Sequence, residues 1–522
     1  MHGATPILRA RDGNATPPSP MRRVGVIDVG SNTARLVVYE APEGGMPRAI
    51  LQRKEIPRMG EGIGPGGRLH PAAVDRGLAS LSRFSKTLAG LGQPLTVAVA
   101  TSAVRDASDG KAFVERAREE TGLPLRILSG EEEARYAYLG VASAWELGND
   151  LVCDLGGGSM QVAFVRRGAF RSAVSLPLGA LRLTEEFFAH DPPKAREVEE
   201  LRDHVREFLS ENLPEHSDHG EFELHGVGGT IRTLARVSIE LKEYPLSRVH
   251  GYPVARRDLE ALAELLTELP SDKRREIRGI GGDRADVIVA GLNAVLELLL
   301  ATGRPYIRVS GMGIREGLVE EALGLELPAP SEVLLTRSAA TASRVFGYAL
   351  GRDEGIGRRA LQLFDLLAPK EKWGPSERRA VLAAALFHDA GAAIDLWGHP
   401  RHTAYLLRTY PVVGLDHREV VLAALTAFQH EGDDLPTAMV KELRQVIDKD
   451  DVRLARKLGV LVYVAETLDD DQVRFQRSDD SLVLSLSPEG ARELSPRAIA
   501  RVRKPLKRAF ELEVEIRGSA GT

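Results

Sequence analysis

The feature that most constrains the fold of this chain is a short pattern that occurs twice. Residues 24–38 and residues 151–165 each contain an apolar run, then Asp-x-Gly, then a small polar or glycine-rich turn, then a second apolar run. Such a pattern predicts a β-hairpin whose turn exposes several backbone N–H groups. Glycine lets the backbone approach a ligand closely, and consecutive N–H groups in a turn bind anions. Two such hairpins facing each other would enclose one phosphoryl group from both sides.

Each copy of the pattern also carries one aspartate, Asp28 in the first and Asp154 in the second. A carboxylate repels phosphate, so these side chains are predicted to hold a divalent cation or to orient a water molecule beside the phosphate. A single Asp-x-Gly hairpin is equally typical of an ordinary tight turn. Two copies after two buried strands favour a phosphate site, and they resemble the phosphate loops of the actin-like superfamily, which includes sugar kinases and chaperone ATPases.

The composition indicates a multidomain globular protein. The chain has 522 residues, of which 43% are hydrophobic and 27% charged. A single core stops growing near about 250–300 residues, so several domains are expected. The only cysteine, Cys153, lies in a predicted buried strand, which excludes a disulfide framework and favours a reducing, cytoplasmic location. The net charge of −5 gives no argument for nucleic-acid binding, and no apolar run reaches the ~18 residues of a membrane span.

Between and after the hairpins, predicted strands alternate with predicted helices, as in α/β proteins. In residues 129–135 (SGEEEAR), Ser129 is predicted to cap a helix whose acidic first turn is stabilised by the helix dipole. That role suffices for Glu131 and Glu132, although a turn between the two phosphate loops would also suit a catalytic carboxylate. Residues 223–231 predict a strand, a glycine turn and a helix, which suits another phosphate or a nucleotide sugar. Residues 283–302 are predicted to form one long apolar helix.

Together these segments resemble the Ppx/GppA family of exopolyphosphatases and guanosine pentaphosphatases. The resemblance covers roughly residues 22–325, on the motifs DVGSNTARL, ATSAVR, SGEEEAR, DLGGGS, GVGGT and GMGIREGLV in this order. It implies two actin-like (ribonuclease H-like) domains. It also implies hydrolysis of a terminal phosphoanhydride, from inorganic polyphosphate or from pppGpp, with Mg²⁺ as the cofactor. Mn²⁺ is an alternative cofactor, because its affinity for nitrogen and oxygen ligands is generally higher.

The resemblance implies roles for individual residues as well. Glu133 matches the base that activates water, and Arg105 matches an arginine that reaches the phosphate. Asp28 and Asp154 match the metal- and water-side acids, and Gln161 stands at a further metal-binding position. The positions that match phosphate-binding residues are Gly30, Ser31, Asn32, Gly156, Gly157, Gly158, Ser159, Gly229 and Thr230.

The chain departs from the family at Gln161. The family usually has Gly-Gly-Gly-Ser-Thr-Glu at the second loop, whereas residues 156–161 read GGGSMQ. An amide oxygen can still coordinate a cation, but one negative charge is lost. Two alternatives to a phosphoanhydride hydrolase therefore stay open: a non-catalytic sensor that binds (p)ppGpp or polyphosphate, and an actin-like kinase. The SGEEEA segment, which sugar kinases and chaperones lack, argues against the kinase.

The last third of the chain is predicted to be mainly helical. Residues 386–391 (LFHDAG) resemble the signature of HD-type phosphohydrolases, in which His-Asp, a second histidine and a distant aspartate bind metal. His399, His402 and His430 are candidate ligands. Residues 358–367 contain no histidine where such enzymes usually place their first ligand, so we expect a helical HD-like fold without metal. Three strand-like runs and a basic helix follow, and the basic helix is predicted to be a solvated face or a guide for a polyanion.

The predicted domain order is a disordered tail (1–20), two actin-like domains (21–130 and 131–325), a linker (326–332), an all-α HD-like domain (333–470) and a small α+β segment (471–522). Long members of the family use the helical domain, with its partner in a dimer, to form a channel for the polyphosphate chain. By this resemblance we expect a homodimer that acts on inorganic polyphosphate or (p)ppGpp, with neither nucleic acid nor a membrane as a partner.

Overall fold

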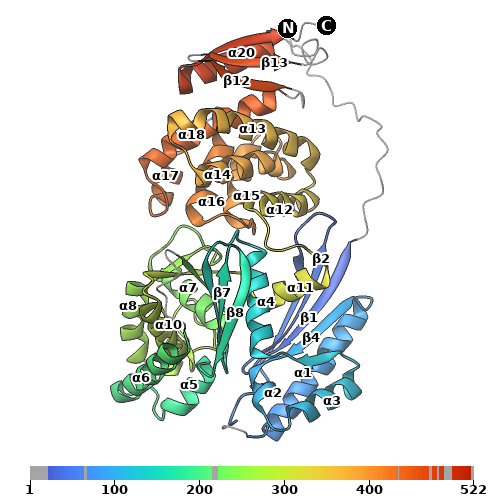
Figure 1. Cartoon of the computed structure of the whole chain (residues 1–522), viewed down its shortest axis with the longest axis vertical. Coiled ribbons are helices and arrows are strands. Elements are labelled where there is room, and N and C mark those ends of the chain that lie inside the picture. The colour runs from blue at the N-terminus through green and yellow to red at the C-terminus, as the bar shows by residue number, and fades with distance from the viewer. Residues whose placement is uncertain are drawn as a thin grey trace.

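The computed structural model of the chain describes residues 21–63, 67–213, 222–432, 434–468, 473–478, 481–486 and 496–518. The tail predicted to be disordered, residues 1–20, lies outside these ranges. Two α/β lobes lie side by side, a helical domain covers one end of both lobes, and a small α+β unit lies beyond it (Figure 1). Among the helices of the described ranges, none is long and apolar enough to cross a bilayer.

The first lobe is built on a five-stranded sheet with the strand order β3-β2-β1-β4-β5. The first predicted hairpin is β1 and β2, which β3 extends in antiparallel fashion, while β4 and β5 run parallel to β1. Helices α1 and α3 pack on this sheet through residues such as Leu81, Phe84 and Phe113. The elements are β1 (Arg22–Val29), β2 (Ala34–Ala41), β3 (Arg48–Glu55), α1 (Pro71–Gly90), β4 (Leu95–Ala100), α2 (Ser102–Asp106), α3 (Gly110–Thr121) and β5 (Leu125–Ile127).

The second lobe repeats this topology around a six-stranded sheet, β10-β11-β9-β6-β7-β8. Strands β6, β7 and β8 are antiparallel neighbours, and β9 and β11 run parallel to β6, as β4 and β5 do to β1. The repeated sequence pattern is therefore a repeat of topology. The elements are α4 (Gly130–Ala142), β6 (Asp150–Leu155), β7 (Met160–Arg166), β8 (Ala169–Leu176), α5 (Ala180–Phe187), α6 (Ala195–Asn212), β9 (Glu223–Val227), α7 (Gly229–Leu241), β10 (Pro253–Ala255), α8 (Arg256–Thr267), α9 (Ser271–Arg274), α10 (Ile288–Thr302), β11 (Tyr306–Val309) and α11 (Ile314–Ala322).

The helix predicted over residues 283–302 begins only at Ile288, so its first five residues were assigned wrongly. Residues 282–287 form turns that lie against the first lobe. There Asp283 pairs with Lys54 at 2.5 Å, and Asp286 pairs with Arg58 at 2.8 Å. These contacts between the lobes fix a segment that the apolar periodicity alone assigned to the helix.

Helices α4 and α11 pack against each other between the two sheets. Each has a glycine at the crossing, and a Cβ at Gly140 or Gly317 would lie 2.1 Å from a backbone oxygen of the facing segment. On its other side α11 places Leu318 and Val319 against β1, whereas α4 packs Val141 on the second sheet. The last helix of the second predicted domain thus covers the sheet of the first.

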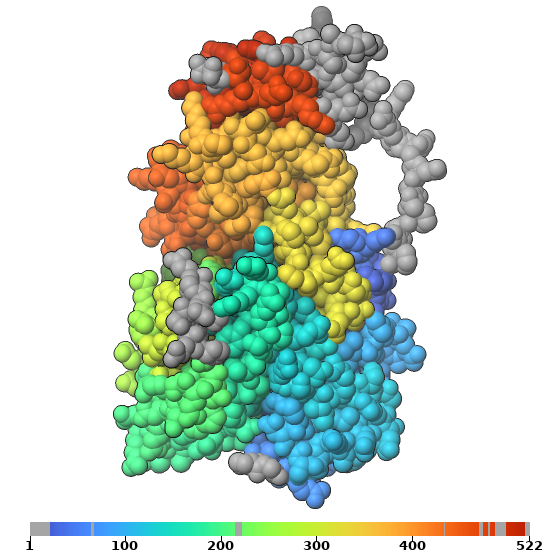
Figure 2. All heavy atoms as spheres, in the orientation of Figure 1, coloured from blue at the N-terminus to red at the C-terminus, as the bar shows by residue number. Residues whose placement is uncertain are grey.

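The helical domain is in contact with both lobes (Figure 2). Thr341 accepts a hydrogen bond from the Met46 N–H of the first lobe at 2.8 Å, and His417 Nε2 lies 3.0 Å from the His250 carbonyl of the second. The first helix, α12, starts at Ser331, inside the predicted linker. The elements are α12 (Ser331–Phe346), α13 (Leu350–Glu371), α14 (Pro375–Phe387), η2 (Ala390–Ala393), α15 (His399–Thr409), α16 (His417–Gln429), α17 (Thr437–Leu443) and α18 (Lys449–Thr467).

The C-terminal unit has the predicted strands and basic helix, but it does not have a core of its own. Its elements are β12 (Arg474–Ser478), β13 (Ser481–Leu486), α20 (Pro496–Phe510) and β14 (Glu513–Gly518). Leu484 of β13 and Val502 and Leu506 of α20 belong to the same buried cluster as the residues of α14 and α16. The unit and the helical domain therefore share one hydrophobic core.

Candidate active site between the lobes

A cavity of about 120 Å³ lies where the turns of the two hairpins meet. It receives residues from both lobes, because β1 and β6 carry their Asp-x-Gly turns at the same edge of their sheets. Most of the predicted site residues line it: Asp28, Gly30, Ser31, Asn32, Glu133, Asp154, Gly156, Gly157, Ser159, Gln161 and Gly229. The structure thus brings together segments that are far apart in the sequence.

The two turns have matching backbone hydrogen bonds. The Gly30 N–H donates to the Thr33 carbonyl and the Gly156 N–H donates to the Ser159 carbonyl, each with an N···O distance of 2.9 Å. Within the described residues, the N–H groups of the two residues inside each turn find no hydrogen-bond acceptor; they are those of Ser31, Asn32, Gly157 and Gly158. Unpaired N–H groups in a tight turn are a ready acceptor site for an anion.

The two turns also touch each other across the lobes. A Cβ at Gly157 would lie 3.2 Å from the Ser31 Cβ, and a Cβ at Gly158 would lie 2.7 Å from the Ser31 Oγ and 2.6 Å from the Ser102 Oγ. Gly158 therefore faces the first lobe and does not line the cavity. Thr230 does not line it either, because its side chain is buried against Gly291 of α10.

The three glutamates at the start of α4 lie in three different environments. Ser129 caps the helix, as predicted. It also forms a capping box with Glu132, which pairs with Arg126 at 2.7 Å. Glu131 is exposed, whereas Glu133 is buried and reaches the cavity. The helical turn set by the Ser129 cap is what directs Glu133, and not its neighbours, toward the phosphate loops.

The pKa values of the carboxylates in the cavity are all raised when no cation is bound. Burial raises the pKa of Glu133 to about 8, against the opposing charge of Arg105. Burial likewise raises the pKa of Asp154 to about 6, and it raises the pKa of Asp28 above its usual range. Asp28 and Asp154 also raise the pKa of Glu133 by mutual repulsion. A bound cation would relieve this repulsion.

Arg105 does not line the cavity. Its guanidinium bonds the Glu133 carboxylate and also donates to the Leu128 carbonyl at 3.2 Å, and its Nε lies 3.4 Å from Asp106. In this structure Arg105 holds the side chain predicted to be the base, whereas the resemblance implied that it reaches the phosphate.

Four other arginines line the cavity, and sequence reasoning missed them: Arg35, Arg232, Arg284 and Arg315. Arg35 stands directly opposite Asp28 in the β1–β2 register, and Arg284 lies in the segment that was predicted to be helical. Burial, with a further contribution from Arg315, lowers the pKa of Arg35 to about 10. The available signal was the position of Arg35 in the motif DVGSNTARL and of Arg315 in the motif GMGIREGLV, in each case shortly after the glycine turn. Such a concentration of guanidinium groups is suited to a polyvalent anion.

Gln161 stands opposite Asp154 in the β6–β7 register, as Arg35 stands opposite Asp28. Its amide nitrogen donates to the Ser159 hydroxyl at 2.7 Å and to the Ser175 hydroxyl at 3.0 Å. These two bonds leave the amide oxygen as the atom that is available to a ligand in the cavity. Together with Asp28 and Asp154 it offers oxygen donors, which are the ligands that Mg²⁺ and Mn²⁺ prefer.

Two lobes of actin-like topology, with an anion-binding turn from each around buried carboxylates and arginines, define a protein that handles phosphoryl groups. Residues 37–326 match the family model of the Ppx/GppA phosphatase family, and residues 338–486 match the model of Ppx/GppA phosphatase, domain III. The chain belongs to the Ppx/GppA phosphatase family.

Similar proteins are known in sequence and in structure. The chain is 34% identical over 307 residues to Exopolyphosphatase 1 of Mycobacterium tuberculosis, which covers 58% of this chain and 89% of the relative. A crystal structure of the Aquifex aeolicus family member is 33% identical, with a TM-score of 0.51, over 58% of this chain and 99% of that one. An exopolyphosphatase structure from Cytophaga hutchinsonii (24% identity, TM-score 0.51, 59% of this chain and all of that one) shares the fold.

Proposed function

We propose that the chain is an exopolyphosphatase that hydrolyses the terminal phosphoanhydride of inorganic polyphosphate, with pppGpp as a second substrate. The observation that carries this proposal is the cavity between the lobes. It combines unpaired N–H groups from two turns, four arginines and one buried glutamate whose pKa burial raises to about 8. The similarity to proteins named Exopolyphosphatase 1 supports the choice of substrate.

In the proposed mechanism the terminal phosphoryl group lies between the two turns. The turn N–H groups and the arginines offset its negative charge, and Glu133 accepts a proton from a water molecule as that water attacks in line. Arg105 orients the Glu133 carboxylate. The leaving group is the shortened polyphosphate, or ppGpp when pppGpp is the substrate, and no covalent intermediate forms.

The residues present fit a divalent cation. Asp28, Asp154 and the Gln161 amide oxygen would hold Mg²⁺ or Mn²⁺, which would supply positive charge to the phosphate oxygens when bound. Two features of the cavity support this assignment: crowded carboxylates whose pKa values are raised, and an amide whose nitrogen is already engaged by two hydroxyls.

A second cavity supports a long polyanion as the substrate. It has a volume of about 450 Å³, lies between α18 and α20, and is lined by five cationic side chains: Arg453, Arg456, Lys457, Lys504 and Arg508. A chain of phosphates that extends beyond the catalytic cavity would be attracted to such a surface, whereas a nucleotide is too short to reach remote cations. We further propose that the chain acts as a homodimer in the cytoplasm.

Phosphate release from long-chain polyphosphate, pppGpp and ATP, with Mg²⁺ or Mn²⁺ and without any acceptor, tests the proposed function. The matched pair of variants is Glu133→Gln and Glu131→Gln, because both residues lie in the same helical turn but only Glu133 reaches the cavity. Hydrolysis that is lost only in Glu133→Gln supports the proposal. Tight binding of polyphosphate or (p)ppGpp by the unmodified chain without turnover would favour the sensor, and a strict need for an acceptor would favour the kinase.

A further inference from the structure

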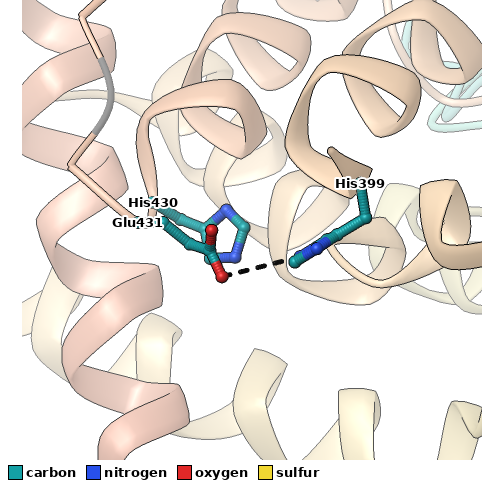
Figure 3. A group of neighbouring side chains, drawn as sticks. All are labelled: His399, His430 and Glu431. Carbon is teal, nitrogen blue, oxygen red and sulfur yellow. Dashed lines mark ion pairs between the residues drawn. The ribbon is translucent and has the colours of Figure 1, made fainter. Parts of the chain in front are cut away.

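Three histidines converge inside the helical domain, far along the chain from the phosphate loops. His388 directly follows α14, His399 begins α15, and His430 directly follows α16. The ring centroids of His388 and His430 are 5.6 Å apart, and those of His399 and His430 are 5.5 Å apart. Figure 3 shows His399 directed toward His430 and Glu431. His402, the other candidate from the sequence, belongs to neither group of potential metal ligands among the described residues.

All three imidazoles are held in the same way. The Nδ1 atom of each lies close to the carbonyl oxygen three residues earlier: 2.8 Å for His388 and Ala385, 3.1 Å for His399 and Leu396, and 2.7 Å for His430 and Ala427. A carbonyl oxygen only accepts hydrogen bonds, so each Nδ1 carries a proton. This arrangement orients a neutral imidazole and leaves Nε2 to bind a metal.

The three Nε2 atoms are buried, and none of them has a hydrogen-bond partner among the described residues. They face carboxylate oxygens instead. Asp389 Oδ1 lies 3.5 Å from the Nε2 of His388 and 3.8 Å from that of His399. Glu466 Oε2 lies 3.8 Å from the Nε2 of His430, and Glu431 Oε1 lies 3.9 Å from that of His399. Two acceptors that face each other repel unless a cation lies between them.

These separations fit a metal ion at the centre of the cluster. Two ligands that are each about 2.1 Å from a tetrahedral metal ion lie about 3.4 Å apart. Each observed nitrogen–oxygen pair, at 3.5–3.9 Å, is close to that separation, and the ligand atoms of His399, His430 and Glu431 all lie within 4.8 Å of one another. Protonation of the imidazoles would also satisfy the carboxylates, but it would place like charges next to one another in a buried site, which is costly.

Arg352 holds the outer oxygens of the same carboxylates. It lies 3.0 Å from Asp389 Oδ2 and 3.2 Å from Glu466 Oε1, so that Oδ1 and Oε2 are left facing the histidines. The next residue of α13, Asp353, is buried 3.7 Å from His388 Nδ1. A carboxylate of α13 therefore lies beside the cluster, although residues 358–367 of that helix contain no histidine.

We propose that this cluster binds a first-row transition metal ion of the Zn²⁺ type, in a site separate from the one between the lobes. The donors are the Nε2 atoms of His388, His399 and His430 with Asp389 Oδ1, which faces two of them, while Glu431 and Glu466 flank the site. Imidazole donors suit Zn²⁺, Fe²⁺ or Ni²⁺ far better than Mg²⁺. The ligands follow α14, begin α15 and follow α16, and Glu466 of α18 flanks them. The ion would therefore cross-link three helices of one core, in a domain for which the sequence favoured a fold without metal.

The test is the metal content of the full chain, produced without a polyhistidine tag or a metal column and measured by mass spectrometry. About one transition-metal ion per chain is expected. A His388→Gln and His430→Gln double variant should lose at least about 90% of that metal, while His402→Gln, on the same domain, should retain it. Full occupancy in the double variant, or no metal in the unmodified chain and no Zn²⁺-dependent rise of its unfolding temperature, would overturn the proposal.

X-ray absorption of the Zn²⁺-loaded unmodified chain gives a second measurement that does not depend on the folding of a variant. Imidazole scattering from about three histidines in the first shell is expected, and a shell without imidazole would contradict the assignment. Neither measurement uses phosphate release, so the outcome is independent of whether the cavity between the lobes hydrolyses polyphosphate.

Discussion

Replacing Gln161 by glutamate restores the charge that the second hairpin lacks, and its effect can be calculated from the register. Gln161 stands directly opposite Asp154, and such cross-strand pairs have Cβ atoms about 4.5–5.5 Å apart. At about 5 Å and an effective dielectric constant of about 20, two carboxylates repel by about 3 kcal/mol. The hydroxyls of Ser159 and Ser175, which now accept from the amide, can rotate and donate to the new carboxylate. We therefore expect the free energy of unfolding of metal-free Gln161→Glu to be about 1–3 kcal/mol lower than that of the unmodified chain.

The same charge should strengthen cation binding. If about half of the repulsion is relieved by a cation, the gain is about 1.4 kcal/mol, which is about a tenfold lower Mg²⁺ concentration for half-maximal phosphate release. The assays are urea unfolding in a chelator and with Mg²⁺, and phosphate release as a function of Mg²⁺. The control, Gln161→Met, has a similar volume without the oxygen and should need more Mg²⁺. An unchanged metal titration in Gln161→Glu would show that residue 161 is not close to the cation. Activity that appears only in this variant would identify the natural protein as a sensor.

Glu133→Gln should retain substrate binding but lose about 10²–10⁴-fold in turnover, which is the usual contribution of a general base. The control, Glu131→Gln, should keep its turnover within a fewfold of the unmodified chain. Equal losses of turnover in both variants would contradict the assignment of Glu133 as the base. Burial raises the pKa of Glu133 to about 8, so the fraction of the inactive protonated form decreases as the pH rises. The value of kcat/KM at low Mg²⁺ should therefore increase through the neutral range and level off above about pH 8. A flat pH profile would contradict this reasoning. The double variant Lys504→Ser, Arg508→Ser should bind long polyphosphate severalfold more weakly, with a smaller loss of affinity at high salt, and should bind pppGpp as the unmodified chain does. An equal loss of affinity for both ligands would point to damaged folding. Point substitutions suit this test better than removal of the C-terminal unit, because β13 and α20 share the core of the helical domain.

The local features of this fold could be predicted from the sequence because they depend on neighbouring residues. The hairpins follow from apolar alternation around glycine turns, and the start of α4 follows from the Ser129 cap. The cap also fixed which glutamate reaches the cavity. The predicted α+β segment at the C-terminus was found for the same reason, as three short apolar runs around an amphipathic helix.

The remainder depends on contacts between distant segments. Arg284 enters the cavity from turns held by Lys54 and Arg58 of the other lobe, and no local pattern indicates that. Arg105 could be placed near the site, but its partner, Glu133, depends on how α2 and α4 meet. The convergence of His388, His399 and His430 depends on how α14, α15 and α16 pack, and Asp353 and Arg352 of α13 lie beside them, which no local pattern indicates.

The contact between the two phosphate turns couples the size of their residues. Ser31 and Ser102 share a hydrogen bond of 2.9 Å directly in front of Gly158, so a methyl group at position 158 must break that bond or act as a steric wedge that changes the angle between the lobes. Such a wedge would misplace every group contributed by the opposite lobe while leaving each lobe correctly folded. The residues of the two phosphate turns can therefore change in size only together. A larger residue on one turn requires a smaller one on the other.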